Sequence, residues 1–352
     1  MLSVVQTLPE EKWRRFVDEH PQGNVFHTPE MFRVFARTKG HRPSLWTVVE
    51  NTRGSDQVLA LMLPVLITLP DGLLPCFTTR AVVYGSVLVA PGPTGREALG
   101  MLLQTYRRKA RTTALFTELR NLSDLSELQP ILEKNGFVYE EHLNYLIDLN
   151  RPSDEILQSV GRSTRKKIRK TLRDNLVQII EVKNRVELEP CYETLQKTFS
   201  RAKVPLADYS LFAAACEELS PKGMARSLLA KVEGVIAACS IELAYKDVIY
   251  GWYGGSDRAY RRISLNEILI WHVLKWGADG DYRLYDFGGA GKPDEKYGVR
   301  DFKAKFGGKL VCFGRNRWVH YPALLRLSEL GYYIYRCCLK QSQWLCRKRT
   351  DA

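Results

Sequence analysis

The chain has 352 residues, which favours two domains over one core, and its 45% hydrophobic and 26% charged residues are typical of a globular protein. Its longest apolar stretch, VLALMLPVLITLP, contains prolines and falls short of the roughly 18 residues of a spanning helix, which argues against an integral membrane protein. The net charge of +13 favours polyanionic partners such as nucleic acid, anionic lipid or phosphorylated intermediates.

The cysteines and histidines show no metal-ligand spacing. The eight cysteines and six histidines are dispersed, and several cysteines sit in apolar runs such as VIAACSIEL, where a free thiol packs as a small hydrophobic group. The first apolar residues, LSVV, are too few for a signal peptide. We therefore predict a cytoplasmic protein in a reducing compartment, without structural disulfides or a bound metal.

The first half of the chain alternates helical and strand patterns. Apolar spacing predicts a helix around Trp13, and the segment TPEMF predicts a second helix with Thr28 as N-cap and Pro29 in the first turn. The later patterns predict strands over 44–50, 57–68 and 80–89, an amphipathic helix over 95–113, a strand over 114–120, and over 125–149 a helix ending at Gly136 followed by a strand or strand pair.

The second half repeats this alternation after a turn-like segment, NRPSDE. The expected elements are a basic helix over 154–174, a strand over 177–182, helices near 188–202 and 209–219, strands over 226–234, 235–245 and 248–256, a helix over 265–280 and a strand over 283–289. This order predicts an α/β fold, with mixed sheets covered by helices. We expect domains at 1–150 and 151–320 and a basic C-terminal helix or tail at 321–352.

Five cations fall on one stripe of the predicted basic helix. They follow i, i+3, i+4, i+7 and i+11 spacing, and no acid is interleaved before Asp174. Like charges four residues apart destabilise an isolated helix, so the stripe is either a solvated face or a surface that contacts phosphate. Its members are Arg162, Arg165, Lys166, Arg169 and Arg173.

A glycine-rich segment, YDFGGAGKPDEKYGVRDFKAKFGG, follows the last predicted strand. Glycine permits sharp turns and close approach of another molecule's backbone. If its second part is helical, Phe302 and Phe306 pack inward while Lys303 lies on another face. The segment is either a solvated hairpin over core aromatics or an anion site containing Lys303 and Lys305. Another segment, IYGWYGGSD, places aromatic side chains and glycines on a strand, as a half-buried central strand or a ligand-facing surface.

With the segments LYDFGGAGKPDEKYGVRDFKAKFGGKLVCFGR, STRKKIRKTLRDNLVQIIEV and FHTPEMFRVFART, the chain resembles the Fem family of peptidoglycan-bridge aminoacyltransferases and the wider group of tandem acyltransferases related to GNAT enzymes. The similarity spans about residues 10–320. It implies two GNAT-like domains, an aminoacyl-tRNA donor, a lipid-linked or nucleotide-linked peptidoglycan precursor as acceptor, and neither metal nor bound organic cofactor.

The resemblance also implies site residues. Phe302 and Lys303 match the Phe-Lys pair of the family, whose lysine is assigned to the acyl-transfer site, and Tyr253 falls at a substrate-contacting tyrosine. A further Arg and Tyr of the family are matched approximately by Tyr209 together with Arg201 or Lys203. The substrate-binding lysine of the family would fall near Phe35, where the closest basic residues are Arg33, Arg37 and Lys39, and the helical-hairpin arm of some members is missing.

Two other functions remain open at this stage. An acyl-CoA-dependent N-acyltransferase would hold pyrophosphate on a glycine-rich loop before the long helix, whereas this chain has RRISLNEIL there. A non-catalytic binder of RNA or of a membrane surface would use the basic, aromatic C-terminal segment, which favours peripheral contact with an anionic membrane at its inner face. For the enzyme, we expect substrate binding by Arg165, Arg169 and Lys305 as well.

Overall fold

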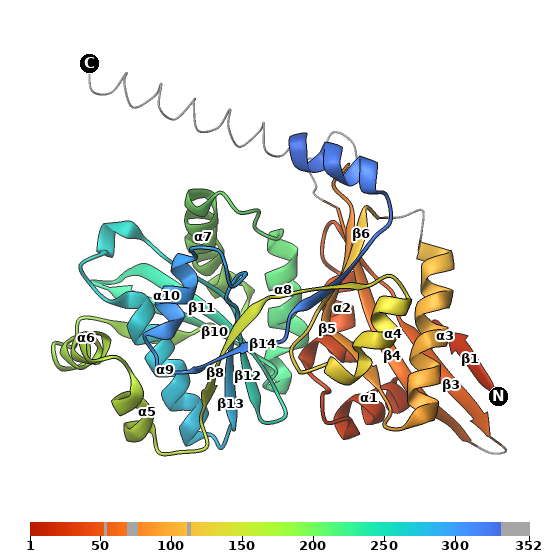
Figure 1. Cartoon of the computed structure of the whole chain (residues 1–352). Coiled ribbons are helices and arrows are strands. Elements are labelled where there is room, and N and C mark those ends of the chain that lie inside the picture. Colours follow the sequence, from red (N-terminus) through yellow and green to blue (C-terminus); the bar gives the residue numbers. More distant parts are fainter. Residues whose placement is uncertain (53–54, 69–76, 111–113, 332–352) are drawn as a thin grey trace.

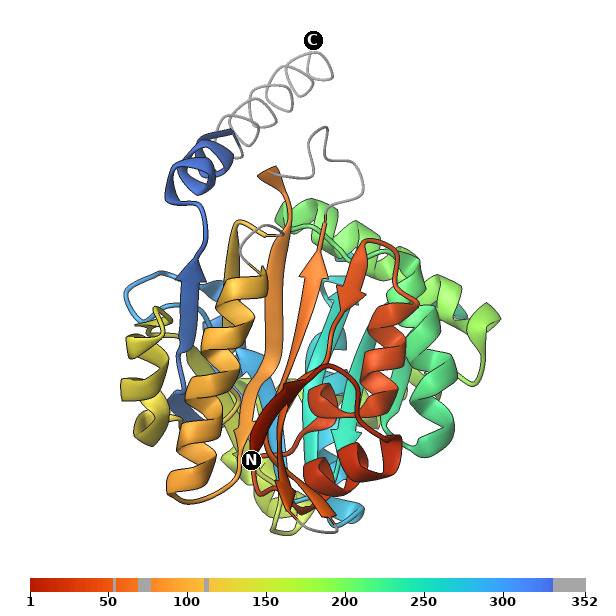
Figure 2. The same ribbon diagram turned by 90° about the vertical axis from the view of Figure 1, so that its right-hand side faces the viewer.

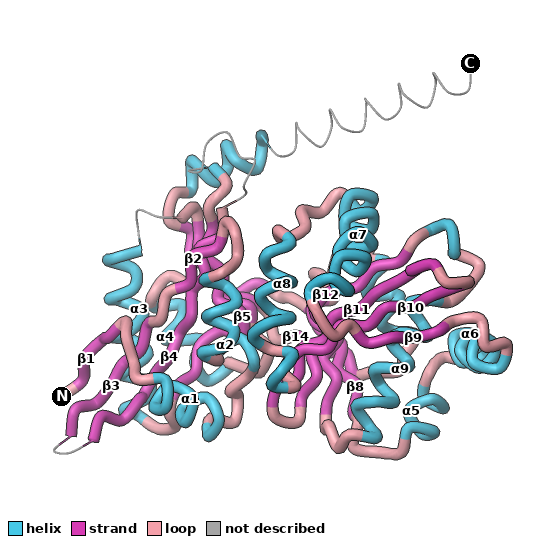
Figure 3. The backbone as a smooth tube through the Cα atoms, turned by 180° about the vertical axis from the view of Figure 1, so that it is seen from behind, coloured by secondary structure: helices cyan, strands magenta, loops and turns pink. Residues whose placement is uncertain are grey.

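The computed structural model describes residues 1–331 except 53–54, 69–76 and 111–113. The described residues form two mixed sheets, one centred in each half of the molecule (Figures 1 and 3). Helices cover the outer face of each sheet and fill the space between the two. The prediction of an α/β fold with mixed sheets is confirmed.

The first sheet contains eight strands in the order β1-β3-β4-β5-β6-β15-β7, with β2 paired to β4. Only β5 and β6 pair in parallel, and the other neighbours are antiparallel. The strands are β1 (Leu2–Val5), β2 (His41–Pro43), β3 (Trp46–Thr52), β4 (Ser55–Ile67), β5 (Arg80–Val89), β6 (Phe116–Arg120), β7 (Val138–Glu140) and β15 (Arg315–Val319).

The second sheet contains seven strands in the order β14-β8-β13-β12-β11-β10-β9. Its parallel pair is β12 with β13, and the remaining neighbours are antiparallel. The strands are β8 (Leu143–Asp148), β9 (Gln178–Glu181), β10 (Ala225–Val232), β11 (Val235–Tyr245), β12 (Val248–Ser256), β13 (Leu284–Gly289) and β14 (Lys309–Cys312).

Two strands cross between the halves. β8 follows β7 of the first sheet but pairs with β13 and β14 in the second, and β15 returns to pair with β6 and β7 in the first. Sheet membership therefore changes after Glu140 and after Cys312, whereas we placed the domain boundaries at 150 and 320. As a consequence, β15, which follows every strand of the second sheet in the sequence, belongs to the first sheet.

Helices form three layers around the sheets. α3 (Pro93–Ala110) packs on the first sheet and lies on its near side in Figure 2, with the second sheet behind. α5 (Ser153–Ser159), α6 (Arg162–Arg173) and α9 (Leu265–Asp279) supply the apolar core on the outer side of the second sheet. The inner layer consists of α1 (Glu10–Glu19), α2 (Pro29–Ala36), α7 (Arg185–Ala202) and α8 (Tyr209–Glu218).

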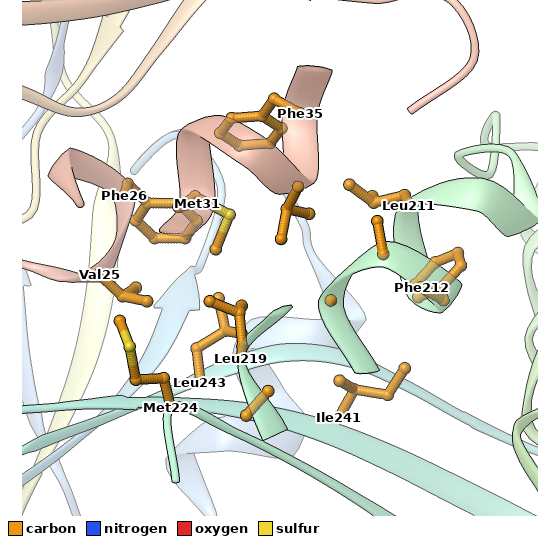
Figure 4. Packing of buried hydrophobic residues seen from close by; sticks show 14 of the residues in the cluster. Val25, Phe26, Met31, Phe35, Leu211, Phe212, Leu219, Met224, Ile241 and Leu243 are labelled. Atoms are coloured by element: carbon orange, nitrogen blue, oxygen red, sulfur yellow. The ribbon is translucent and has the colours of Figure 1, made fainter. Parts of the chain in front are cut away.

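The inner layer is a single apolar core shared by both halves. Figure 4 shows Phe26, Met31 and Phe35 of the first half facing Leu211 and Phe212 of α8. All five side chains are at least 97% removed from solvent. α2 packs directly against α8, so the inner layer joins the first half of the molecule to the second.

Several predicted elements are confirmed and one differs. Thr28 caps α2 by accepting a hydrogen bond from the Met31 amide at 3.2 Å, as predicted. The basic helix expected over 154–174 is instead two helices, α5 and α6, because the chain extends at Val160 and the Gly161 amide donates to the Lys305 carbonyl at 2.8 Å. A helix also covers residues 322–331, and the rest of the tail expected at 321–352 lies outside the described residues.

The remaining short elements connect these parts. They are α4 (Gln129–Lys134), α10 (Gly298–Ala304) and the 3-10 turns η1 (Val25–His27), η3 (Ser126–Leu128), η4 (Ser220–Lys222) and η5 (Arg258–Tyr260). α10 carries the Phe-Lys pair and follows the glycine-rich segment after β13. The position of α10 therefore bears on how the glycine-rich segment lines the cavity described below.

Candidate active site

A cavity of about 500 Å³, the central cavity, lies between the two sheets. The first half contributes Tyr84 from the middle of β5 and Arg120 at the end of β6, and the second half contributes Tyr250 and Tyr253 from β12. Residues 204–208, between α7 and α8, also line it. Large concave sites of mixed apolar and polar lining at domain interfaces are where substrates usually bind.

The central cavity opens where two parallel strands part. β12 and β13 pair only from Val248–Leu284 to Tyr250–Asp286. Beyond this point Trp252 and Tyr253 of β12 and Gly289 of β13 line the cavity. The register between β11 and β12 also shifts at Trp252, which has no cross-strand partner on β11 and therefore marks a β-bulge.

A second cavity of about 320 Å³, the side cavity, adjoins the first. Both cavities are lined by His142, Gly289, Tyr297 and Arg315. The remaining side-cavity residues are mostly charged: Glu140, Glu141, Lys292, Glu295 and Arg317, with Gly291. These four shared residues therefore stand at the junction of two adjoining spaces.

Three arginines converge on one buried carboxylate at this junction. Glu118 Oε1 accepts hydrogen bonds from Arg120 Nε at 2.7 Å and from Arg315 Nη1 at 3.2 Å, and Oε2 accepts from Arg317 Nη2 at 3.1 Å. Burial raises the pKa of Glu118, but the guanidinium groups outweigh burial and hold the pKa at about 2. Glu118 is thus a permanent anion that fixes the arginines in place.

The central cavity carries a surplus of positive charge. Lys39, Arg80, Arg120 and Arg315 line it, against the single lining carboxylate of Asp208 and the underlying Glu118. These four cations face two carboxylates, which leaves a surplus of two. Burial and then the neighbouring charge of Arg120 lower the pKa of Arg315. A bound anion would relieve this repulsion, so the arrangement suits a phosphate or carboxylate group.

His142 adds a neutral imidazole to the junction. Its Nε2 lies 2.9 Å from Arg315 Nη2 and accepts a hydrogen bond from it, because an arginine can only donate. Burial, followed by the charge of Arg315, lowers the pKa of His142 to about 4. The proton of the neutral ring is therefore on Nδ1, and His142 contributes no charge at neutral pH.

Lys303, expected to meet an anion, is buried on backbone carbonyls instead. Only 8% of this residue is exposed, and Nζ donates to the carbonyls of Phe287, Gly288 and Gly289 at 2.5, 3.1 and 2.8 Å. Burial lowers the pKa of Lys303 to about 8, while the nearby carboxylate of Asp286 opposes that shift. The ammonium lies just behind Gly289, which lines both cavities.

The other residues carried over from the resemblance divide into two groups. Tyr253 lines the central cavity, packed against Phe199 and Phe212, and burial raises its pKa. Tyr209 does not line the central cavity. Its hydroxyl instead donates to the Arg185 carbonyl at 3.0 Å. Phe302 packs on Phe306 behind the cavity wall.

Arg201 and Lys203 flank the loop that lines the cavity. Arg201 donates to the Ser256 carbonyl at 3.2 Å, and Lys203 ends α7 in a left-handed conformation with φ of 57°. Neither lines a cavity, although the loop that follows them, 204–208, does. Lys305 is exposed and stands 5.5 Å from the ring centre of Phe302, outside both cavities.

The basic stripe lies away from the cavities. Figure 1 shows α6 at the outer end of the second half, beside α9. Arg165 donates to the Gln158 carbonyl at 2.5 Å, and Arg169 is exposed. The structure therefore does not bring Arg165 and Arg169 together with Tyr253.

Sequence analysis missed the residues that form the candidate anion pocket: Tyr84, Arg120, His142, Tyr250 and Arg315. A signal was present, because Glu118 and Arg120 alternate in FTELR and Arg315 and Arg317 alternate in RNRW, so each pair lies on one face of a strand. That these two strands are neighbours depends on the return of β15 to the first sheet.

The described residues show neither a metal site nor a membrane span. No group of three or more potential His, Cys, Asp or Glu ligands occurs among them. None of the helices in the described part of the chain combines the length and apolarity that crossing a bilayer requires.

A protein-family model matches part of the chain. The model described as acetyltransferase (GNAT) domain matches residues 158–303, which include β9–β13 and the start of α10 up to Lys303. No curated protein matches the chain. The match agrees with the expectation of an N-acyltransferase and confirms that prediction at the level of the enzyme class.

Solved structures share the whole architecture at low sequence identity. The structure of FemX matches with a TM-score of 0.70 and 17% identity, covering 92% of this chain and 99% of that one. A tandem GNAT protein from the clavulanic acid biosynthesis pathway matches with a TM-score of 0.59 and 13% identity, covering 92% and 99%. The C-terminal domain of a putative lysylphosphatidylglycerol synthetase from Agrobacterium fabrum matches with a TM-score of 0.56 and 14% identity, covering 92% and 96%. These likenesses show the fold: two tandem GNAT-like halves, arranged as in FemX.

Proposed function

We propose that the protein is an aminoacyltransferase that moves an aminoacyl group from aminoacyl-tRNA to an amine of a lipid-linked or nucleotide-linked peptidoglycan precursor. The observation that carries this proposal is the central cavity, where β12 and β13 part and where Arg120 and Arg315 leave a surplus of positive charge. Both proposed substrates carry phosphate. The likeness in fold to FemX and to a lysylphosphatidylglycerol synthetase domain supports the choice of reaction.

The chemistry requires little from the protein beyond alignment. An aminoacyl ester is already activated, so the acceptor amine attacks the carbonyl carbon, the C–O ester bond breaks, and the ribose hydroxyl leaves with a proton from the amine. Holding the two groups together can supply roughly 7 to 11 kcal/mol of the barrier. Arg120 and Arg315 would bind a substrate phosphate, and the aromatic wall of Tyr250 and Tyr253 would position the acceptor.

Negative charge builds on the carbonyl oxygen during attack. The β-bulge at Trp252 places a backbone segment without a cross-strand partner on the cavity wall, and its N–H is the candidate donor to that oxygen. Donors of this kind contribute about 2.7 to 4 kcal/mol. We propose that Lys303 and Phe302 support this site from behind the wall.

The outer surface contributes to binding in this proposal. Arg165 and Arg169 on α6 would attract the RNA body over a distance, since they lie outside the cavity. Arg201, Lys203 and Tyr209 would act through the loop at 204–208, and Lys305 would contact substrate outside the wall. Peripheral contact with an anionic membrane would bring the protein to a lipid-linked acceptor at the inner face.

A second candidate is an acyl-CoA-dependent N-acyltransferase of cell-envelope or exopolysaccharide synthesis. The match of residues 158–303 to an acetyltransferase model favours it. The segment before α9 argues against it, because it contains no glycine, and Ser264 makes no side-chain capping bond at the start of that helix.

The test is a paired incubation with an amine-bearing precursor. One reaction contains aminoacyl-tRNA labelled in its amino acid, and the other contains acetyl-CoA labelled in its acetyl group. We expect label from the aminoacyl-tRNA on the precursor and none from acetyl-CoA. The reverse result would select the second candidate, and transfer from neither would leave a binding protein.

A further inference from the structure

All three N–H groups of Lys303 are occupied within the protein. An ammonium has three donors, and they bind the carbonyls of three consecutive residues, Phe287, Gly288 and Gly289. The side chain is buried behind these peptide groups and does not line either cavity. To contact a substrate oxygen, Lys303 would have to release a buried carbonyl.

A second cation of α10 makes the same kind of contact one turn earlier. Arg300 donates through Nε to the Ala290 carbonyl at 2.9 Å and through Nη1 to the Pro293 carbonyl at 3.0 Å, and Nη2 binds the Lys292 carbonyl. Residues three apart lie on one face of a helix. Lys303 and Arg300 together therefore bind six carbonyls of a single segment, residues 287–293.

We call residues 287–293 the wall, because they contribute lining residues to both cavities. Gly289 lines both, and Gly291 and Lys292 line the side cavity. A Cβ on Gly289 would come within 2.8 Å of His142 Nε2, so the wall is in close contact with the group that accepts from Arg315. Gly288 has φ of 70°, and a Cβ there would lie 3.0 Å from the Tyr250 hydroxyl. Any shift of residues 287–289 would displace these cavity residues.

α10 itself is anchored, so it can serve as a fixed support. Phe306, just after the helix, is completely buried and its ring centre lies 5.5 Å from that of Phe287. The Lys305 carbonyl accepts from the Gly161 amide at 2.8 Å, which ties the helix end to the start of α6.

We propose that Lys303 and Arg300 are positioning residues that fix the backbone of 287–293, and through it the junction of Gly289, His142 and Arg315. Their positive charge is directed at the carbonyl dipoles of the wall, and the substrate meets the opposite side of that wall. The glycine-rich segment thus binds cations of its own chain, while the anion of the substrate is left to Arg120 and Arg315. The expected effect on turnover rests on the proposed function, but the effect on the wall does not.

The experiment measures hydrogen–deuterium exchange in the free protein, without substrate. Lys303→Met and Arg300→Met remove the donors, Lys303→Arg keeps a cation with several donors, and Lys309→Met is the control, because Lys309 is an exposed lysine outside both cavities. We expect amides of 288–292 to exchange about tenfold or more faster in both Met variants. Exchange in Lys303→Arg should be closer to wild type, and exchange in the control and in β10 and β11 should be unchanged.

A binding measurement separates positioning from a merely structural role. Inorganic pyrophosphate is titrated calorimetrically into wild type, Lys303→Met, Arg315→Gln and the double variant. We expect Lys303→Met to weaken binding about tenfold in the wild-type background and to have little further effect once Arg315 is changed, because it acts through that residue.

Three results would overturn the proposal. Wild-type exchange at 288–292 in both Met variants would show that the cations do not hold the wall, and a loss of turnover in Lys303→Met alongside it would assign Lys303 to direct substrate contact. Faster exchange throughout the second sheet would make the effect one of global stability. Additive losses in the pyrophosphate cycle would separate Lys303 from Arg315. None of these results depends on which acyl donor the enzyme uses.

Discussion

Arg315 on β15 donates to Glu118 on β6 at 3.2 Å, although 197 positions separate them in the sequence. This pairing exists because β15 leaves the second half and returns to the first sheet. It also brings Arg315 to the junction of the two cavities, where Arg315 Nη2 donates to His142 Nε2 at 2.9 Å. The anion pocket is therefore a product of the strand exchange between the two halves.

Replacing Arg315 should remove most of the anion affinity. In Arg315→Gln, Glu118 keeps Arg120 and Arg317 as partners, so the fold should persist. Loss of a charge-assisted hydrogen bond corresponds to about 10- to 100-fold weaker pyrophosphate binding, measured by calorimetry. The matched control is Arg283→Gln, which removes an exposed ion pair with Asp247, and neither residue lines a cavity. Equal affinity in wild type and Arg315→Gln would place the anion elsewhere.

Activity should depend on pH through the pair below the shared wall. Burial raises the pKa of Asp286 to about 6 and lowers that of Lys303 to about 8. Between these values both are charged: the carboxylate accepts from the Gly288 amide at 2.7 Å and the ammonium holds three carbonyls. As pH falls through about 6 the carboxylate is neutralised, and as pH rises through about 8 the ammonium loses a donor.

We therefore expect kcat/KM to be highest between about pH 6 and pH 8 and to fall on both sides. His142, with its pKa lowered to about 4, should not contribute to the acidic limb. The substitution Asp286→Asn should remove the limb near pH 6 and leave the alkaline limb in place. An unchanged pH profile in that variant would show that Asp286 is not the group whose protonation lowers kcat/KM near pH 6.

Glu30 should make the largest single contribution to the contact between the halves. Its carboxylate is fully buried and binds Arg14 at 2.6 Å, and Lys222 of the second half donates to it as well. Burial opposes ionisation, but these two cations outweigh it and lower the pKa of Glu30 to about 2. Because the folded-state value lies below the ordinary 4.5, the stabilisation is complete above pH 4.5 and is lost as pH falls towards 2.

Denaturant titration of Glu30→Gln should show a loss of about 1 to 3 kcal/mol in the free energy of unfolding at neutral pH, since two half-exposed cations lose a buried, charged hydrogen-bond partner. The loss should shrink as the pH is lowered below 4.5, where wild-type Glu30 becomes protonated. Glu10→Gln is the control, because Glu10 forms exposed ion pairs with Arg14 and Arg33 that contribute at most about 1 kcal/mol. A smaller effect for Glu30→Gln than for Glu10→Gln would refute this assignment.

The basic stripe should affect RNA binding without affecting the pocket. Replacing both Arg165 and Arg169 with Gln should weaken binding of deacylated tRNA and reduce the slope of log affinity against log salt concentration by about 2. Pyrophosphate binding should stay at the wild-type value, because α6 does not line the cavity. Identical tRNA affinity at every salt concentration would make this stripe a solvated surface.

The sequence allowed the fold class and most elements to be predicted, because these depend on local patterns. Thr28 and Pro29 identified the start of α2, and a run rich in β-branched residues identified β5. The break between α5 and α6 was missed because it depends on the carbonyl of Lys305, which is far away in sequence. The strand exchange was missed for the same reason, since nothing local to β8 or β15 specifies which sheet accepts it.

The site was predicted only in part. Tyr253, expected to contact substrate, lies on the cavity wall, while Lys303 was expected to meet an external anion and instead binds carbonyls of its own chain. Residue type indicates that a lysine can bind negative charge, but it does not indicate whether that charge belongs to a ligand or to backbone dipoles. The surplus of positive charge on the central cavity arises from Lys39, Arg80, Arg120 and Arg315, whose proximity requires the tertiary structure.

The most direct measurement of the central claim is single-turnover transfer of a labelled aminoacyl group from aminoacyl-tRNA to an amine-bearing precursor, by wild type and by Arg315→Gln. We predict transfer by the wild type and a rate reduced about tenfold or more in the variant. Equal rates in the two proteins, or no transfer from aminoacyl-tRNA by the wild type, would contradict the account.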